Sequence, residues 1–357
     1  LYRLLSGPGY AEYYRRKVTQ AGIDVQLESA VTSWIDEHTV QLTSPQGIMS
    51  IHAKAILLAT GCREKPRAAL RIPGSRPEGV FTTGSLQDFV HGYHLPVGSR
   101  AVIVGSELVS YSAIYTLKKA ECKPVAMVTE YPRSQVYPPY TLFKWWSADF
   151  INHIPLKSNA QIGRIIGRDR VRAVEVKNSL DKTIEIISCD TVVFTGNWIP
   201  EHELVRLAKI EMNEHTNGPL IDLQYRTLHK GIFAAGNLLR GAETADVAAL
   251  EGRSAAISIE KYLKSDKWPM DTVSIRIGEP IEWLVPSVIR VDDLFRPHPF
   301  LFRVKSFLKN PTLAVYQDGT LIFQRQYRNI GPNYSFRLDN RWVAKLKNNN
   351  DVFIKVV

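Results

Sequence analysis

The N-terminal part of the chain alternates apolar and polar positions in a pattern that predicts one helix followed by strands. Residues 8–20 have the composition of a helix, which Gly22 can end. Three β-rich segments follow, separated by the turns DEH and PQG: residues 23–35, 38–44 and 47–61. The last segment contains AILLA, and such a continuous apolar run is typical of an inner parallel strand covered on both faces. This order predicts a meander followed by a buried strand.

A second unit begins near residue 100 with the order strand, helix, strand. These elements are predicted at 100–105, 107–120 and 124–130, and a βαβ start favours a parallel sheet. The preceding residues 62–99 are rich in Pro, Gly and Arg and predict a connection. Later predicted elements are an apolar strand ending at Gly196, strands at 220–227 and 231–236, and an Ala-rich helix at 244–263.

The pattern changes after about residue 266. Short segments there alternate apolar and polar residues, and QDGT (317–320) supplies an Asp-Gly hairpin turn. We therefore expect a separate, small antiparallel β domain at the C-terminal end. Parallel strands with helices in front of such a domain predict the α/β fold class.

The composition is that of an ordinary folded protein. Of the 357 residues, 45% are hydrophobic and 22% are charged, which excludes a disordered, collagen-like or disulfide-scaffold chain. The net charge is +10, and a basic excess favours anionic partners such as dinucleotides, nucleic acid or an acidic subunit. Because the sequence has no long basic block, we expect no nucleic-acid partner.

The three cysteines, Cys62, Cys122 and Cys189, are far apart in sequence and form no C-x-x-C pair. A redox dithiol, a zinc site and an iron–sulfur cluster all need closely spaced thiolates, so the sequence predicts none of them. His91 and His94 lack a third ligand nearby, and we expect no metal site. A sparse, odd cysteine count suits the cytoplasm.

The sequence has no apolar run of the ~20 residues that a membrane span requires, so we expect no membrane span. The chain begins with Leu1 rather than Met, and its first residues lack a signal-peptide pattern. We therefore expect this chain to be a piece whose true beginning is missing.

Three apolar strands end in small residues and a glycine: AILLATG (55–61), VVFTG (192–196) and GIFAAG (231–236). Ligands of open α/β sheets bind at the carboxyl ends of parallel strands, where small residues let a dinucleotide approach the backbone. Each of these segments alone fits a tight strand exit better than a binding site. All three in this order, with a βαβ unit between the first two, indicate a dinucleotide-binding protein.

The ordered segments ATG (59–61), VIVG (102–105), FTGNWIP (194–200) and TLHKGIFAAGN (227–237) resemble the FAD-dependent pyridine nucleotide-disulfide oxidoreductase superfamily. Within it, ATGCREKPR and AAGNLLRGAETADVAALEGR are most similar to flavoprotein subunits of amine, opine and cyanide-forming dehydrogenases. The similarity covers about residues 1–265. It implies two Rossmann-like three-layer domains, one inserted in the other, in front of the antiparallel β domain.

The resemblance also implies how the chain is divided. An FAD-binding domain is expected at 1–95 and 219–265, and it is truncated because the family's first Gly-rich motif is absent. An NAD(P)-binding-like domain is expected at 96–218, inserted between the two parts of the FAD-binding domain. The C-terminal β domain is expected at 266–357.

The resemblance assigns FAD contacts to individual residues. Asn237 takes the position of an acid in the family, and its amide can still hydrogen-bond a hydroxyl. A helix beginning at Thr244 would direct its free N–H groups and positive dipole end toward the flavin pyrimidine. The expected cofactor-binding residues are Val31 near the adenine, then Ala59, Thr60, Gly61, Gly236, Asn237, Thr244 and Ala245.

The second nucleotide site departs from its motif. A Rossmann turn requires G-x-G-x-x-G, but the three positions are Gly105, Glu107 and Ser110. A carboxylate about 4 Å from a phosphate repels it by ~1 kcal/mol even in water. Glu130 stands where a ribose-binding acid belongs, and Gly196 ends a neighbouring strand. NAD(P) binding is therefore doubtful, and a domain kept for packing or subunit contact is the favoured alternative.

The leading hypothesis is an FAD-dependent oxidoreductase without a redox dithiol. It would be a dehydrogenase or oxidase subunit that takes a hydride from an amine, amino-acid-like or alcohol donor, or relays electrons within a complex. Two alternatives stay open: an NAD(P)H-dependent flavin reductase and a non-catalytic assembly subunit. The expected partners are a small-molecule substrate and other subunits or a second copy of the chain. The sequence identifies no catalytic base.

Overall fold

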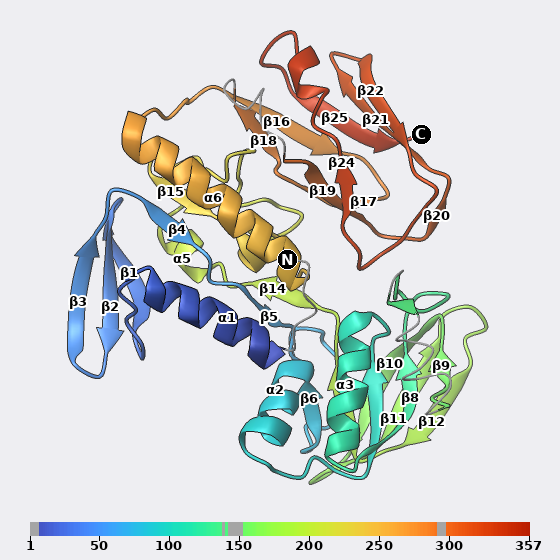
Figure 1. Ribbon diagram of the computed structural model, residues 1–357. Helices are drawn as coiled ribbons and strands as arrows, with labels where there is room; N and C mark the ends of the chain where they lie inside the picture. Colours follow the sequence, from blue (N-terminus) through green and yellow to red (C-terminus); the bar gives the residue numbers. More distant parts are fainter. Residues whose placement is uncertain (1–6, 138–139, 142–152, 291–297) are drawn as a thin grey trace.

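The computed structural model describes residues 7–137, 140–141, 153–290 and 298–357. Figure 1 shows three groups of elements. We call them the first unit (α1 to β5 and β14 to α6), the inserted unit (β6 to β13) and the C-terminal unit (β16 to β25). Within the described ranges, no helix is both long and apolar enough to cross a lipid bilayer.

The first unit contains the predicted helix and meander. Strands β1, β2 and β3 form a three-stranded antiparallel sheet. Strand β4 pairs in parallel with β15, and this sheet has two strands. The prediction that AILLA is covered on both faces is wrong for Leu57, which is 39% exposed, because so small a sheet leaves part of β4 uncovered. The bounds are α1 Gly7–Gln20, β1 Ala30–Asp36, β2 Thr39–Ser44, β3 Gly47–His52, β4 Ile56–Leu58, β5 Cys62–Glu64, β14 Trp198–Pro200, α5 Glu203–Leu207, β15 Ile232–Ala234, η3 Gly236–Leu239 and α6 Ala245–Ser265.

The inserted unit has three layers, and its βαβ start is confirmed. A five-stranded parallel sheet runs in the order β6-β13-β7-β8-β9. Leu86 of α2 and Leu117 of α3 pack on one face, against Ile103 of β7. A three-stranded antiparallel sheet covers the other face through Ile162 and Val174. The bounds are β6 Val80–Thr82, α2 Thr83–Gln87, η1 Asp88–Gly92, β7 Arg100–Val104, α3 Leu108–Lys119, β8 Lys123–Val128, β9 Leu156–Lys157, β10 Ala160–Gly167, β11 Val171–Asn178, β12 Ile184–Ser188 and β13 Thr191–Phe194.

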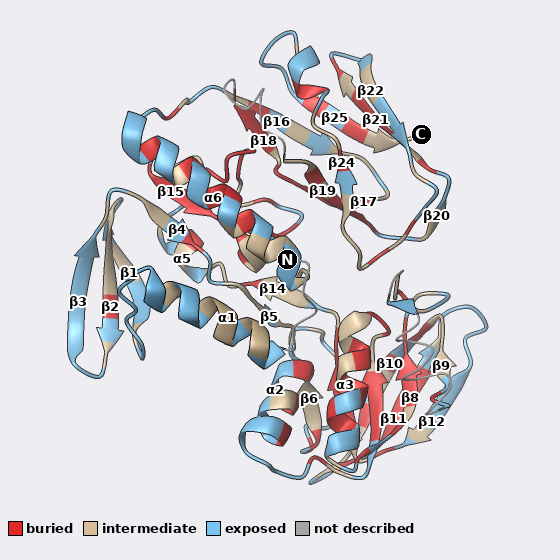
Figure 2. Cartoon of the chain, in the orientation of Figure 1, coloured by how far each residue is buried: buried red, intermediate tan, exposed pale blue. Residues whose placement is uncertain are grey.

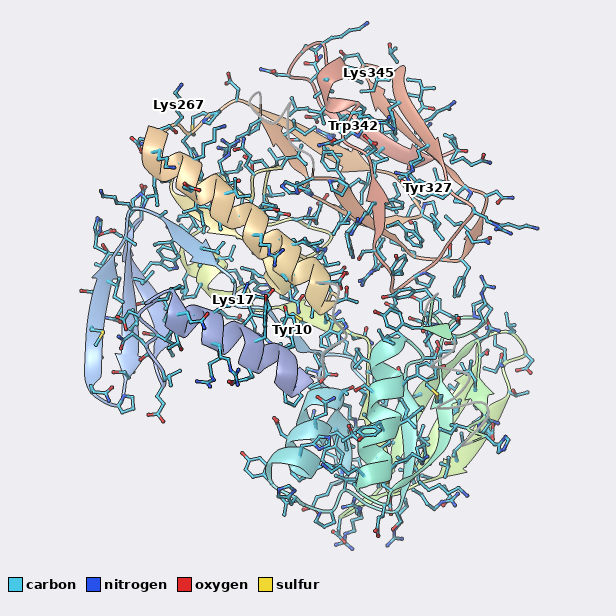
Figure 3. The ribbon with its side chains drawn as sticks, viewed as in Figure 1. Tyr10, Lys17, Lys267, Tyr327, Trp342 and Lys345 are labelled. Atoms are coloured by element: carbon cyan, nitrogen blue, oxygen red, sulfur yellow. The ribbon has the colours of Figure 1, made fainter. Side chains whose placement is uncertain are left out.

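The C-terminal unit consists of β-sheets, as predicted. Its strands pair mostly antiparallel, although β16 and β25 run parallel, and the Asp318–Gly319 turn joins β21 to β22. Trp342, labelled in Figure 3, lies in the core. Its ring stacks on that of Phe300, with ring centroids 5.1 Å apart. The bounds are β16 Thr272–Ile277, β17 Ile281–Val285, β18 Val288–Arg290, β19 Phe300–Val304, β20 Leu308–Lys309, β21 Thr312–Gln317, β22 Thr320–Gln326, β23 Asn329–Ile330, β24 Phe336–Leu338, η5 Val343–Lys345 and β25 Val352–Val356.

Defined contacts join the three units. The chain enters and leaves the inserted unit through β5 and β14, which pair antiparallel. The ring centroids of Tyr137 and Tyr334 lie 3.8 Å apart, and this contact connects the inserted and C-terminal units. The inserted unit was expected to span residues 96–218, but its sheet already starts with β6 at Val80. Helix α5 falls within the expected range, yet it packs on β1 of the first unit. The predicted domain boundaries stay a prediction.

Candidate functional site

The carboxyl ends of β4 and β15 lie next to each other in the first unit. The two strands pair in register, with Leu58 opposite Ala234, and the Ala235 N–H donates to the Leu58 carbonyl at 3.1 Å. The segments that follow, Ala59 to Gly61 and Gly236 to Asn237, therefore leave the same edge of the sheet. Two segments far apart in sequence meet here, as the strand-end glycines predicted.

Gly61 and Gly236 give this edge an open backbone. Their φ angles are +79° and +76°, a region that glycine adopts at little cost. A Cβ at either position would have no atom within 4 Å, so nothing in the protein fills the space beside these glycines. Ala59 and Thr60 are exposed, and the Thr60 hydroxyl donates to the Glu201 carbonyl at 2.7 Å. Such bare backbone at parallel strand ends can admit a dinucleotide.

Asn237 connects this edge to the start of α6. Its Oδ1 accepts the Glu243 N–H at 3.1 Å, and its carbonyl accepts the Gly241 N–H at 3.0 Å. Thr244 is the N-cap of α6 and makes no side-chain capping bond, so the first turn keeps N–H groups for another partner. The Tyr10 hydroxyl on α1 donates to the Ala245 carbonyl at 3.3 Å (Figure 3).

Val31 lies apart from this arrangement. It is on β1 in the meander, where it pairs with Leu42 and is exposed. The structure therefore brings the other predicted cofactor-binding residues to one edge, and it places Val31 in a different sheet. The assignment of all eight residues to FAD stays a prediction.

Sequence reasoning missed Glu251, which fixes the shape of this edge. Its Oε2 accepts the Gly236 N–H at 3.0 Å, and its Oε1 accepts from Arg240 Nη2 at 2.5 Å. The available signal was its position on α6, because Glu251 shares a face with the buried Ala255 and Ser258 at helical spacing. A carboxylate on the buried stripe of a helix needs a partner, and Arg240 supplies it.

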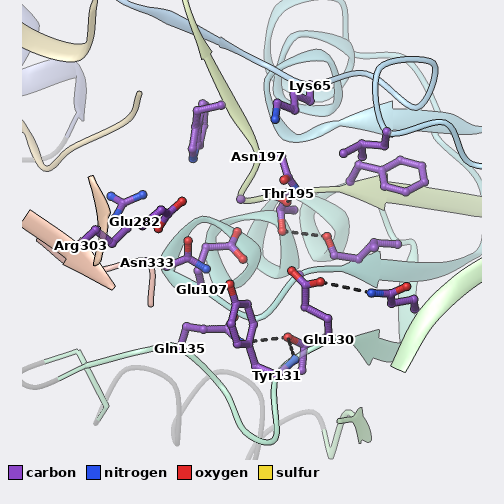
Figure 4. Close-up of a pocket in the computed structure, with 18 of the residues that line it drawn as sticks. Lys65, Glu107, Glu130, Tyr131, Gln135, Thr195, Asn197, Glu282, Arg303 and Asn333 are labelled. Atoms are coloured by element: carbon purple, nitrogen blue, oxygen red, sulfur yellow. Dashed lines mark hydrogen bonds between the residues drawn. The ribbon is translucent and has the colours of Figure 1, made fainter. Parts of the chain in front are cut away.

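A cavity of about 480 Å³ lies where the three units meet. Figure 4 shows Glu282 and Arg303 from the C-terminal unit across this space from Glu107 and Glu130 of the inserted unit. Burial raises the pKa of Glu282, and the nearby Arg303 opposes that rise. Glu130 accepts from Gln161 Nε2 at 3.2 Å. The cavity therefore has charged groups of both signs within reach of one small molecule.

The residues of the predicted second nucleotide site also lie at this cavity. Gly105 follows β7 and Gly196 follows β13, which are adjacent parallel strands, and Glu130 follows β8. All three line the cavity. The structure thus brings these residues together, although their role in nucleotide binding stays a prediction.

The three thiols lie in environments that keep them protonated. Burial raises the pKa of Cys62 to about 11 and that of Cys122 to about 11. It also raises the pKa of Cys189 to about 12, with the Asp190 carboxylate adding to the effect. A raised thiol pKa disfavours the thiolate, which is the reactive form of cysteine.

Comparisons with known proteins agree with this arrangement. A family model described as pyridine nucleotide-disulphide oxidoreductase matches residues 4–252, more than half of the chain. The soluble pyridine nucleotide transhydrogenase of Pseudomonas putida (strain GB-1) is 25% identical over 231 residues, which cover 64% of this chain and 47% of that protein. A protein of the same name from Pseudomonas entomophila (strain L48) matches to the same extent. The chain spans about half the length of the curated relatives it matches.

Solved structures share the fold. T. acidophilum thioredoxin reductase matches with a TM-score of 0.61 at 19% identity, over 73% of this chain and 82% of that one. The bacillithiol disulfide reductase of Bacillus cereus matches with a TM-score of 0.58 at 20% identity, over 73% of this chain and 78% of that one. The predicted α/β fold of two dinucleotide-binding-type domains is confirmed.

Proposed function

Because the chain belongs to the pyridine nucleotide-disulphide oxidoreductase family, we propose that it forms part of an FAD-dependent oxidoreductase that works without a redox cysteine pair. FAD is the cofactor of this family. The proposed protein takes a hydride from an amine, amino-acid-like or alcohol donor, or relays electrons within a complex. It would act as one subunit of a flavoprotein assembly or as a homo-oligomer.

The open edge formed by Gly61 and Gly236 is the observation that carries this proposal. Both glycines leave space at adjacent strand ends, and the edge leads through Asn237 to the N-terminus of the 21-residue helix α6. Residues 59–61 and 236–237 would pass close to the cofactor, and the first turn of α6 would stabilise negative charge beside it. When bound, FAD would accept the hydride and pass the electrons on.

The cysteines support a route without a dithiol. A redox pair needs a reactive thiolate with a second sulfur beside it. Cys62 is partly buried and its pKa is raised to about 11, while Cys122 and Cys189 are buried in the inserted unit. In the proposed enzyme, the electrons therefore pass between the donor and the flavin without a disulfide.

The cavity between the three units supports a small polar donor. Its wall carries the indoles of Trp198 and Trp283 together with charged groups, including Lys65 and Arg303. Aromatic walls with a few polar groups are typical of small-molecule sites. We propose that the donor enters this cavity.

The proposal is tested by titrating the chain into FAD, following the quenching of flavin fluorescence, and then adding donors under anaerobic conditions with excess FAD present. Bleaching of the bound flavin by an amine, an amino acid or an alcohol, followed by reoxidation with an artificial acceptor, is the expected result. A protein that carries the family's first Gly-rich motif ahead of these residues and still leaves flavin fluorescence unchanged would refute the cofactor assignment. A bound flavin that no donor of the three classes bleaches would refute the reaction.

A further inference from the structure

The turn between β7 and α3 is where a Rossmann-like domain seats the pyrophosphate of a dinucleotide, and it needs bare backbone there. In this chain the Glu107 side chain turns into that space. A Cβ on Gly196 would lie 2.6 Å from Glu107 Cδ, and a Cβ on Gly105 would lie 2.8 Å from Glu107 Oε2. The carboxyl group therefore lies directly against the backbone of both glycines, and Glu107 is only 7% exposed.

Two hydroxyl groups fill the space that Glu107 leaves. Ser110, at the third glycine position of the motif, is fully buried, and its Oγ lies 2.7 Å from Thr195 Oγ1. A Cβ on Gly105 would lie 1.9 Å from Thr195 Oγ1 and 2.9 Å from Ser110 Oγ. Three side chains therefore meet over Gly105, whereas nothing lies within 4 Å of the same position at Gly61 or Gly236.

A second observation, independent of Glu107, concerns the loop after β8, which covers the turn from outside. The Gln135 N–H donates to the Ser106 carbonyl at 3.1 Å, and Ser106 Oγ donates to Gln135 Oε1 at 3.0 Å. Ser134 Oγ donates to the same Ser106 carbonyl at 2.9 Å. Ser106 is completely buried as a result. The loop therefore fixes the backbone from which the Glu107 side chain projects, and the carboxyl group is what an arriving phosphate would have to displace.

We propose that Glu107 is a built-in plug that takes the place of the dinucleotide pyrophosphate, so that the inserted unit binds neither NAD(H) nor NADP(H) at this turn. The side chain fills the space, and a carboxylate displaced only slightly would repel the phosphates. The residues present do not fit a pyridine dinucleotide, although the sheet and helix that would present one are complete.

The rest of the nucleotide-type site is retained. Glu130 follows β8, lines the cavity and lies where it could bind ribose hydroxyls. Glu107 is the only charged group among the three side chains that meet over Gly105, and the Ser110 and Thr195 hydroxyls can themselves donate to a phosphate. Substituting Glu107 alone should therefore open a latent site. The NAD(P)H-dependent reductase alternative would need this site to be open. The proposal does not depend on the flavin chemistry, because nucleotide binding is measured without FAD or a donor.

The test is a titration of the 357-residue chain into NADH and into NADPH, followed by nicotinamide fluorescence. The wild type and Glu107→Gln are expected to show no saturable binding, since glutamine has nearly the same volume. Glu107→Gly restores the second glycine of the motif and should gain saturable binding, at least about tenfold tighter than the wild type. Glu107→Ala keeps a Cβ and should gain less.

Two controls separate binding at the β7–α3 turn from a general effect of losing a negative charge. Glu185→Ala removes an exposed acid of the same unit, which pairs with Lys157 at 2.7 Å, and should gain nothing. Adding Glu130→Ala to Glu107→Gly should cost most of the gained affinity if ribose binds at Glu130. Saturable binding by the wild type would overturn the proposal, and so would a folded Glu107→Gly and Glu107→Ala pair without gain. Equal binding by the Gln and Gly variants would overturn the role of side-chain volume.

Discussion

Gly61 and Gly236 follow the two-stranded pairing of β4 and β15, whereas Gly105 and Gly196 follow inner strands of a five-stranded parallel sheet. The space beside the first pair is open, and that beside the second is filled by Glu107 and Thr195. We call the edge at Gly61 and Gly236 the open cradle and the edge at Gly105 and Gly196 the closed cradle. The more complete sheet thus carries the closed cradle. The difference teaches that the fold presents a nucleotide edge but the side chains at the turn decide whether a ligand can use it.

The two units are also stabilised differently. Figure 2 shows strands β8 and β11 of the inserted unit as mostly buried, while the meander strands of the first unit are largely exposed or intermediate. The first unit relies more on buried charges shared with the C-terminal unit. Asp222 pairs with Arg226 at 2.6 Å and with Arg290 at 3.3 Å, and all three are buried.

Asp222→Asn should produce the largest effect of the changes considered, because it leaves two buried guanidinium groups without their shared carboxylate. Breaking a buried ion pair in this way costs about 3–5 kcal/mol. We expect amide hydrogen exchange to show lost protection in β15 and β18, with β7 of the inserted unit nearly unchanged. Equal losses in β15 and β7 would show that the two units unfold together and would break the comparison.

Asp339→Asn is the matched control for this substitution. Asp339 pairs with Arg341 at 2.8 Å, and the side chains of these residues are 26% and 77% exposed, in contrast to the fully buried Asp222 pairs. An exposed ion pair contributes about 0–1 kcal/mol, so this variant should keep the protection pattern of the wild type. A loss as large as that of Asp222→Asn would mean that burial does not decide the effect.

The alternation of apolar and polar residues predicted the meander, the βαβ start and the hairpin at Asp318–Gly319, because these depend on local periodicity and turn chemistry. The strand-end glycines predicted the open edge for the same reason. The sequence could not show that Leu57 is partly exposed, since that depends on how many strands flank β4. Glu251 was missed because a glutamate on a helix is usually a solvated residue, and only its contact with Arg240 reveals its role.

Gly61→Val should close the open cradle and produce the second largest effect. Valine at a φ of +79° is strained, and its methyl groups would occupy the space beside the backbone. We expect the dissociation constant for FAD to rise by more than about tenfold, equivalent to 1.4 kcal/mol, as measured by quenching of flavin fluorescence.

Gly319→Val controls for backbone strain alone. Gly319 has a φ of +76° and equally open surroundings, but it lies in the hairpin turn of the C-terminal unit. This variant should lose a similar amount of stability and keep its FAD affinity. If both variants bind FAD like the wild type, Gly61 does not border the cofactor and the open cradle is not a binding site.

Glu107 was expected from the sequence to stand beside a phosphate, and its inward orientation could not be predicted. A residue at this turn can face the ligand or the protein. The choice depends on Ser110 in the first turn of α3 and on Thr195, which comes from the end of β13. Burial raises the pKa of Glu107, while hydrogen bonds from the Thr195 and Ser110 hydroxyls oppose the rise. The closed cradle therefore has a pH dependence through Glu107.

Glu107→Gln should have the smallest effect of these substitutions, a change in the free energy of unfolding on the order of 1 kcal/mol. The pH dependence of this change sharpens the comparison of the two cradles. Because the pKa of Glu107 is raised on folding, the folded chain holds this proton more tightly than the unfolded chain. The wild type therefore keeps its full stability below the unfolded pKa and loses stability as the pH rises toward the folded pKa. Glutamine does not titrate, so the difference in free energy of unfolding between Glu107→Gln and the wild type should grow from pH 4 to neutral pH, measured by urea unfolding at each pH. Other groups titrate alike in both proteins and cancel in this difference. A difference that does not change with pH would mean that the buried carboxyl ionises as freely as an exposed one.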